Sequence, residues 1–165
     1  MYTKQNFIDS FTHDIHTIKH LATKITPEMA LYRHNEGQRS MTDLLQYLSF
    51  AGVAAVDMIL SNDTGVFASY SQKATSVNLD NFQDAMKEQE KMMIDLMEKF
   101  TEEELNKTVN IFNMGENTKG AYLVNTVGKW FPAYRMQMFL YLKSAGVANI
   151  GTMNMWAGMD MPASN

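Results

Sequence analysis

Three histidines near the start of the chain share one face of a predicted helix. His16 and His20 are four residues apart, and His13 lies on the same stripe. Two histidines at this spacing can bind a common divalent metal ion. The stripe lies roughly opposite the apolar residues of the same stretch, so we expect it to face solvent or a partner subunit. A solvated polar face and a metal site on His16 and His20 are both open interpretations.

A second group of candidate site residues lies in the run 130–137. Trp130 and Tyr134 are four residues apart and Gln137 follows three residues later, which predicts that all three share one stripe of a helix. Aromatic rings that carry a hydroxyl or an N–H group suit a pocket for a small, mostly apolar or aromatic ligand. They also suit packing within a core, and the spacing alone favours neither use.

Several kinds of chemistry are excluded by what the sequence lacks. The chain has no cysteine, so it has no thiolate metal ligand and no cysteine nucleophile. The stretch 115–120 is too short to match a phosphate-binding loop, and no nucleophile elbow is present. We therefore expect no cofactor and name no catalytic residue.

Charge and hydropathy limit the partners and the location of the protein. The net charge of −4, with no basic stripe, argues against nucleic acid as a partner. No apolar run looks long enough to cross a membrane, and the first residues lack the apolar stretch of a signal peptide. These observations predict a cytoplasmic protein.

Four stretches with helical periodicity must position the candidate residues, and no strand pattern competes with them. They cover residues 4–24, 40–61, 80–100 and 118–145, and we expect Ser40, Asp80 and Thr118 to cap the last three. Residues 62–79, rich in Ser, Thr, Asn and Gly, form one long connection. Four long helices with one crossover predict an all-α four-helix bundle in a single domain, residues 1–165.

The fourth stretch has two unusual features. Pro132 lies well inside it and removes the hydrogen bond to the carbonyl of Gly128, which predicts a kink. Apolar side chains extend almost around this helix, as expected of a central helix or of one with a second apolar face at an oligomer interface. Gly146 has the position that commonly ends a helix.

The order of these elements and several motifs resemble the DinB-like (YfiT-like) superfamily of four-helix bundles. The resemblance covers nearly the whole chain and rests on residues 39–48, 134–137, 140–147 and 155–160. It implies a homodimer. In the metal-binding members of the superfamily it also implies three histidine ligands, one in the second helix and a pair four residues apart in the fourth.

None of the three histidines is present at the matching positions. The motif that begins at Ser40 places the second-helix ligand at Tyr47, and the segment 135–137 places the pair at Trp130 and Tyr134. Tryptophan has no lone pair for a metal, and a neutral tyrosine is a poor ligand. The resemblance therefore implies a metal-free site, which either binds a small molecule or is filled by its own aromatic rings.

Three further residues complete the predicted site. Gln137 matches a glutamine of the superfamily, and we expect it to form hydrogen bonds within the core or toward the ligand pocket. Arg39 is expected to pair with a carboxylate, and Asp57 to be solvated. The alternative function is a metal-dependent hydrolase or thiol transferase of the superfamily's kind, with its metal relocated to His16 and His20.

Overall fold

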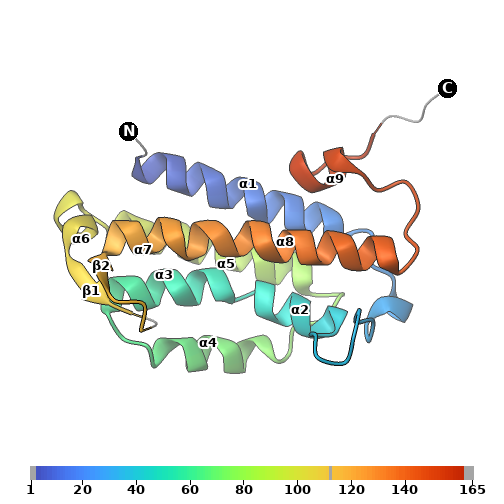
Figure 1. The fold of residues 1–165 in the computed structure, drawn as a ribbon, viewed down its shortest axis with the longest axis horizontal. Coiled ribbons are helices and arrows are strands. Elements are labelled where there is room, and N and C mark those ends of the chain that lie inside the picture. Colours follow the sequence, from blue (N-terminus) through green and yellow to red (C-terminus); the bar gives the residue numbers. More distant parts are fainter. Residues whose placement is uncertain (1–2, 112, 162–165) are drawn as a thin grey trace.

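Four long helical segments run side by side in the computed structural model, which describes residues 3–111 and 113–161. Residues 1–2, 112 and 162–165 of the expected domain lie outside the described residues. The four segments are α1 (Lys4–Ala22), α2 with α3 (Met41–Leu48 and Ala51–Ser61), α5 (Phe82–Glu98), and α7 with α8 (Lys119–Asn125 and Val127–Ser144). Figure 1 shows their common axis, and the prediction of an all-α four-helix bundle is confirmed.

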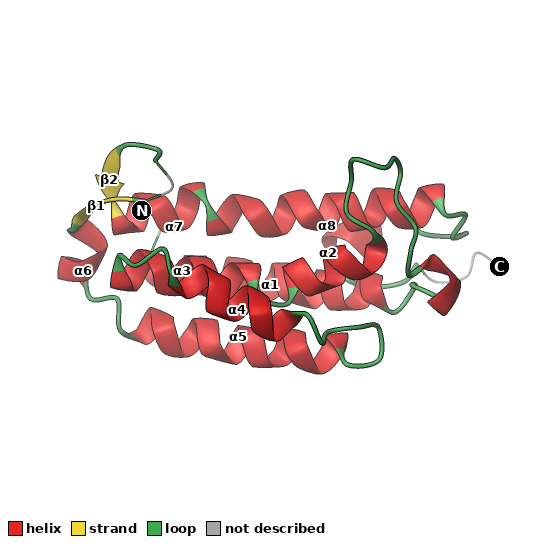
Figure 2. Ribbon diagram, turned by 90° about the horizontal axis from the view of Figure 1, so that it is seen from below, coloured by secondary structure: helices red, strands yellow, loops and turns green. Residues whose placement is uncertain are grey.

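Shorter elements connect the segments. They are η1 (Pro27–Met29), α4 (Val66–Ala74), α6 (Glu102–Asn106), β1 (Thr108–Asn110), β2 (Glu116–Thr118) and α9 (Thr152–Trp156). Two expectations were wrong here, because the connection 62–79 contains a helix and because two strands are present. The strands form an antiparallel ribbon with Val109 opposite Asn117, and Figure 2 shows it at one end of the bundle.

The predicted helix starts are confirmed in two cases of three. The Ser40 hydroxyl accepts from the N–H of Asp43, whose carboxylate accepts from the N–H of Ser40 in return. Thr118 caps α7 through the N–H of Ala121. The expected cap by Asp80 was wrong, because α5 begins at Phe82 and Asn81 has the N-cap position.

The second helical segment is interrupted between α2 and α3, and Gln89 of α5 satisfies the backbone groups there. Its amide oxygen accepts from the N–H groups of Gly52 at 3.0 Å and Val53 at 3.3 Å. Its amide nitrogen donates to the carbonyl of Leu48 at 2.7 Å. Gln89 is only 2% exposed. Without these bonds, its amide and the backbone groups at the interruption would both be buried and unpaired.

The fourth segment is interrupted at Thr126, which the sequence did not predict. The Thr126 hydroxyl donates to the carbonyl of Tyr122 at 2.5 Å, and α8 begins at the next residue. Pro132, where we expected the kink, lies inside α8. Gly146 ends α8 with a φ of 87°, as predicted.

The second segment is also the most apolar part of the chain. Residues Met41–Ser61 are long and apolar enough to cross a membrane by length and composition, contrary to our expectation. The fold buries 72% of that apolar window, as in the core helix of a soluble protein. Gly52 allows this segment to approach α8, because a Cβ at that position would lie 2.4 Å from the Phe131 ring.

A buried ion pair joins α1 to α8. Arg135 Nη1 donates to Asp14 Oδ1 at 2.5 Å, and the two side chains are 5% and 7% exposed. Burial raises the pKa of Asp14 above its usual value, against the opposite influence of Arg135 and then His13. Among the described residues, Arg135 Nε has no hydrogen-bond partner. Neither member of the pair was singled out from the sequence.

Removing one member of this pair should destabilise the fold more than removing both. Asp14→Leu leaves the Arg135 charge buried and unpaired, which should lower the free energy of unfolding by about 3–5 kcal/mol. The double variant Asp14→Leu/Arg135→Met should recover most of that loss, because no buried charge remains. Urea denaturation measures both.

The control is Asp84→Leu, which removes the exposed ion pair between Asp84 and Lys87. This change should alter the stability by less than about 1 kcal/mol. An Asp14→Leu variant as stable as the control would contradict the importance of the buried pair.

Candidate functional site

Tyr47 of α2 and Tyr134 of α8 lie against each other at the centre of the predicted site. Their ring centroids are 4.8 Å apart, with an angle of 58° between the ring planes. The Arg39 guanidinium carbon lies 4.2 Å from the Tyr47 centroid and 5.6 Å from that of Tyr134, within the range of a cation–π contact. We call these three residues the aromatic stack.

The role of Arg39 differs from our expectation. Among the described residues, Arg39 forms no ion pair with a carboxylate, and its charge lies over two aromatic rings instead. Arg39 directly precedes Ser40, the residue that caps α2. The turn that starts α2 therefore also holds the guanidinium over Tyr47.

Trp130, the third predicted residue, is one helical turn before Tyr134. These two side chains, with Ala51 and Gly52, help to enclose a cavity of only about 10 Å³. Such a volume is close to the minimum for one water molecule. The structure thus brings the predicted residues together but leaves almost no space beside Trp130 and Tyr134.

The aromatic stack does not fit a metal ion. Tyrosine binds metals as a phenolate, and burial, followed by the neighbouring Tyr134 hydroxyl, raises the pKa of Tyr47 above its usual value. The Arg39 cation 4.2 Å from the Tyr47 ring would also repel a second cation. The donor set and the local charge both disfavour the metal that the resemblance associates with these positions.

Gln137, the fourth predicted residue, lies at the edge of a larger hollow rather than within the core. Its amide nitrogen donates to the Tyr141 hydroxyl at 2.9 Å. The Tyr141 hydroxyl is 2.9 Å from the carbonyl of Arg39 and 3.2 Å from the amide oxygen of Gln38, and it donates to one of them. This chain of hydrogen bonds fixes the Gln137 side chain.

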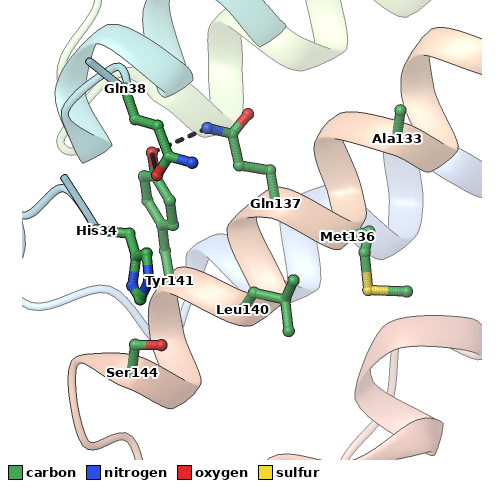
Figure 3. A pocket seen from close by; sticks show the side chains of 8 residues that line it. All are labelled: His34, Gln38, Ala133, Met136, Gln137, Leu140, Tyr141 and Ser144. Carbon is green, nitrogen blue, oxygen red and sulfur yellow. Dashed lines mark hydrogen bonds between the residues drawn. The ribbon is translucent and has the colours of Figure 1, made fainter.

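The hollow beside Gln137 has a volume of about 410 Å³. Figure 3 shows the eight residues that line it, which we call the α8 hollow: His34, Gln38, Ala133, Met136, Gln137, Leu140, Tyr141 and Ser144. Six of them belong to α8, and the other two to the loop before α2. Ala133, Met136 and Leu140 supply apolar surface, while His34, Gln38 and Gln137 supply hydrogen-bonding groups.

Of the eight residues that line the α8 hollow, the sequence had identified only Gln137, and His34 is one of those it missed. The His34 side chain is exposed and makes no hydrogen bond or ion pair with any other described residue. Its position on the α8 hollow comes from the fold of residues 30–40 against α8, which no local spacing reveals. A loop histidine more than a hundred residues from Tyr141 gives no signal of that proximity.

The predicted histidine pair does not form a metal site with other side chains. Within residues 3–111 and 113–161, no three His, Asp or Glu side chains are grouped so that they could hold a metal ion. His13 and His16 are exposed, as expected of a stripe that faces solvent, whereas His20 is half-buried. His13 donates to the carbonyl of Trp156 at 2.7 Å, and His20 contacts Asn154 at 3.1 Å.

A second hollow, of about 420 Å³, lies beside α4 and contains none of the predicted site residues. Tyr70 of α4 lines it and donates to the carboxylate of Asp57 at 3.0 Å, so Asp57 is not simply solvated as expected. Burial and the Asp57 carboxylate raise the pKa of Tyr70 to about 12. This bond attaches α4 to α3.

The raised pKa of Tyr47 predicts that this residue does not ionise in the pH range in which a free tyrosine does. A free tyrosine ionises near pH 10, whereas the folded chain should keep Tyr47 neutral there. Wild-type protein and Tyr47→Phe should therefore show the same rise in absorbance at 295 nm between about pH 8 and 10.5. A rise in the wild type that exceeds the variant's by one tyrosine would show that Tyr47 ionises normally.

Comparison with known proteins places the fold. No protein-family model matches the chain, and no curated protein sequence matches it. The crystal structure of a DinB-like protein from Bacillus subtilis, YjoA, is similar to this chain with a TM-score of 0.70 and 17% identity. The match covers 88% of this chain and 95% of that one. The chain therefore has a DinB-like four-helix fold, as the sequence motifs indicated.

Proposed function

We propose that this chain is a metal-free member of the DinB-like superfamily that binds a small, mostly apolar or aromatic molecule in the α8 hollow. The observation that carries the proposal is the hollow itself, which has room for a ligand directly beside Gln137. Its volume of about 410 Å³ lies within the range of small-molecule sites. The cavity next to Trp130 and Tyr134 does not.

The lining of the α8 hollow defines the class of ligand. Ala133, Met136 and Leu140 offer an apolar surface to a ring or an aliphatic body, and methionine adapts to irregular shapes. His34 and Gln38 can form hydrogen bonds with a polar end of the same molecule. A ligand with an apolar body and one polar end satisfies both surfaces.

The aromatic stack is connected to this hollow through Arg39 and Tyr141. Arg39 takes part in both, because its guanidinium lies over Tyr47 while its carbonyl is 2.9 Å from the Tyr141 hydroxyl. Tyr141 in turn receives the hydrogen bond from Gln137. In this proposal Tyr47, Trp130 and Tyr134 hold the wall of the site, and Gln137 faces the ligand.

Other sequence-based expectations stay proposals. The homodimer is a proposal from the resemblance alone, because the exposed Met136 and Leu140 of α8 already line the proposed ligand site. The metal-dependent enzyme with ligands on His16 and His20 has no supporting observation, since the His20 ring already contacts Asn154. The cytoplasmic location is likewise a prediction from sequence.

Filling the α8 hollow should abolish binding of an aromatic probe. We expect anilinonaphthalene sulfonate to gain fluorescence with wild-type protein, and Ala133→Phe to weaken its binding about tenfold or more, since the new ring occupies the apolar surface. Ala68→Phe adds the same ring at an exposed position of α4 and should leave binding unchanged.

Chemical shifts of the His34 ring provide an independent measure. They should move on titration with the probe in the wild type and not in Ala133→Phe. Equal binding by the wild type and Ala133→Phe would overturn the proposed site, as would the absence of any probe binding.

A further inference from the structure

Residues 151–160, which include α9, pack against the histidine stripe of α1, while His13 and His16 keep exposed surface. Figure 1 shows α9 beside the second half of α1, although the two are far apart in the sequence. His13 Nε2 donates to the carbonyl of Trp156 at 2.7 Å. Lys24 Nζ donates to Asp160 Oδ2 at 2.7 Å, so polar contacts attach this segment at Trp156 and at Asp160.

Between these two contacts, Gly158 lies directly on His16. Gly158 has a φ of 63°, a backbone conformation that side chains disfavour. A Cβ there would lie 2.7 Å from His16 Cδ2, which is too close for any real contact. Glycine at this position thus allows the backbone to pass over the imidazole ring.

The Asn154 side chain contacts His20, and this contact depends on whether the His20 ring is protonated. Asn154 is fully buried, and its side-chain oxygen accepts from the N–H of Gly151 at 2.8 Å. Its amide nitrogen therefore faces Asp160 Oδ1 at 2.8 Å and His20 Nε2 at 3.1 Å. An amide nitrogen only donates, so His20 Nε2 must present a lone pair, and the ring must be neutral with its proton on Nδ1.

We propose that residues 151–160 form a latch on α1 that opens when His20 is protonated. Protonation places an N–H on Nε2, where it points at the N–H of Asn154 and cannot accept from it. The buried amide of Asn154 then loses one of its two acceptors, and solvent restores it only if the segment leaves α1. His13 donates through Nε2 in either charge state, so its bond to Trp156 does not respond to the same change.

The net effect of burial and of the neighbouring charges on the pKa of His20 also favours the neutral ring in the closed state. Burial lowers the pKa of His20 below its usual value, while Asp160, 3.5 Å away, raises it less and Lys24 and His16 lower it further. Asp160 is already shared by Lys24 and Asn154. Because the pKa is lowered in the closed state, closure is favoured above the free histidine value of about 6.5 and is weakened as the pH falls through the lowered value.

Opening would also expose part of the main bundle. The Trp156 ring lies over the Arg135 guanidinium, with 5.1 Å between the guanidinium carbon and the ring centroid. Arg135 is 5% exposed in the closed state and paired with Asp14. Release of the latch would remove this cover from the joint between α1 and α8, so acidification would act on the bundle as well as on the C-terminal segment.

Hydrogen exchange tests the latch in the whole protein. The opening constant of residues 151–159, corrected for the intrinsic exchange rate, should rise severalfold, up to a limit of about tenfold, from pH 7.5 to pH 5.5 in the wild type. His20→Gln offers an amide oxygen to Asn154 at every pH and should lose this response. The control His34→Gln removes an exposed histidine elsewhere and should respond like the wild type.

Two results would overturn the proposal. One is an opening constant that does not change with pH in the wild type, and the other is an unchanged pH response in His20→Gln. A measurement without any variant covers the case in which His20→Gln does not fold. Long-range proton–nitrogen spectra at pH 7.5 should show the His20 proton on Nδ1, and a proton on Nε2 would contradict the latch.

Discussion

The contact between Tyr47 and Tyr134 is the constraint on which the proposed site depends. It joins α2 to α8 at a centroid distance of 4.8 Å and fills the positions where the resemblance places metal ligands. Arg39 adds a positive charge over the same rings, so a second cation is disfavoured there. The backbone carbonyl of Arg39 then positions Tyr141, and Tyr141 positions Gln137 on the α8 hollow. One arrangement therefore disfavours a metal ion at these positions and also positions Gln137 beside the α8 hollow.

Much of the bundle could be predicted because its signals are local. Helical periodicity marked the four long segments, and the side chains of Ser40 and Thr118 marked two of the helix starts. The ribbon of β1 and β2 escaped prediction because each strand has three residues and only Val109 is buried, too little for an alternating pattern. The helix α4 escaped because only its Ala74 is buried and the surrounding stretch, rich in Ser, Thr, Asn and Gly, is typical of a loop.

The site was predicted only in part, because its contacts join distant parts of the chain. The spacing within the fourth stretch identified Gln137, whereas His34 belongs to a loop whose position depends on tertiary packing. The buried pair of Asp14 and Arg135 is separated by 121 residues, and a charged residue on an apolar helix reads as solvent-facing until its partner is known. The histidine stripe was identified, but its contact with residues 151–160 could not be.

The most direct test is a zinc titration by calorimetry on tag-free protein. If Tyr47, Trp130 and Tyr134 occupy the ligand positions, the triple variant Tyr47→His/Trp130→His/Tyr134→His should bind one more zinc ion per chain than the wild type, because three imidazoles would converge there. Two results would contradict this assignment. One is a folded triple variant that gains no zinc, and the other is stoichiometric zinc in the wild type that Tyr47→Phe/Tyr134→Phe removes.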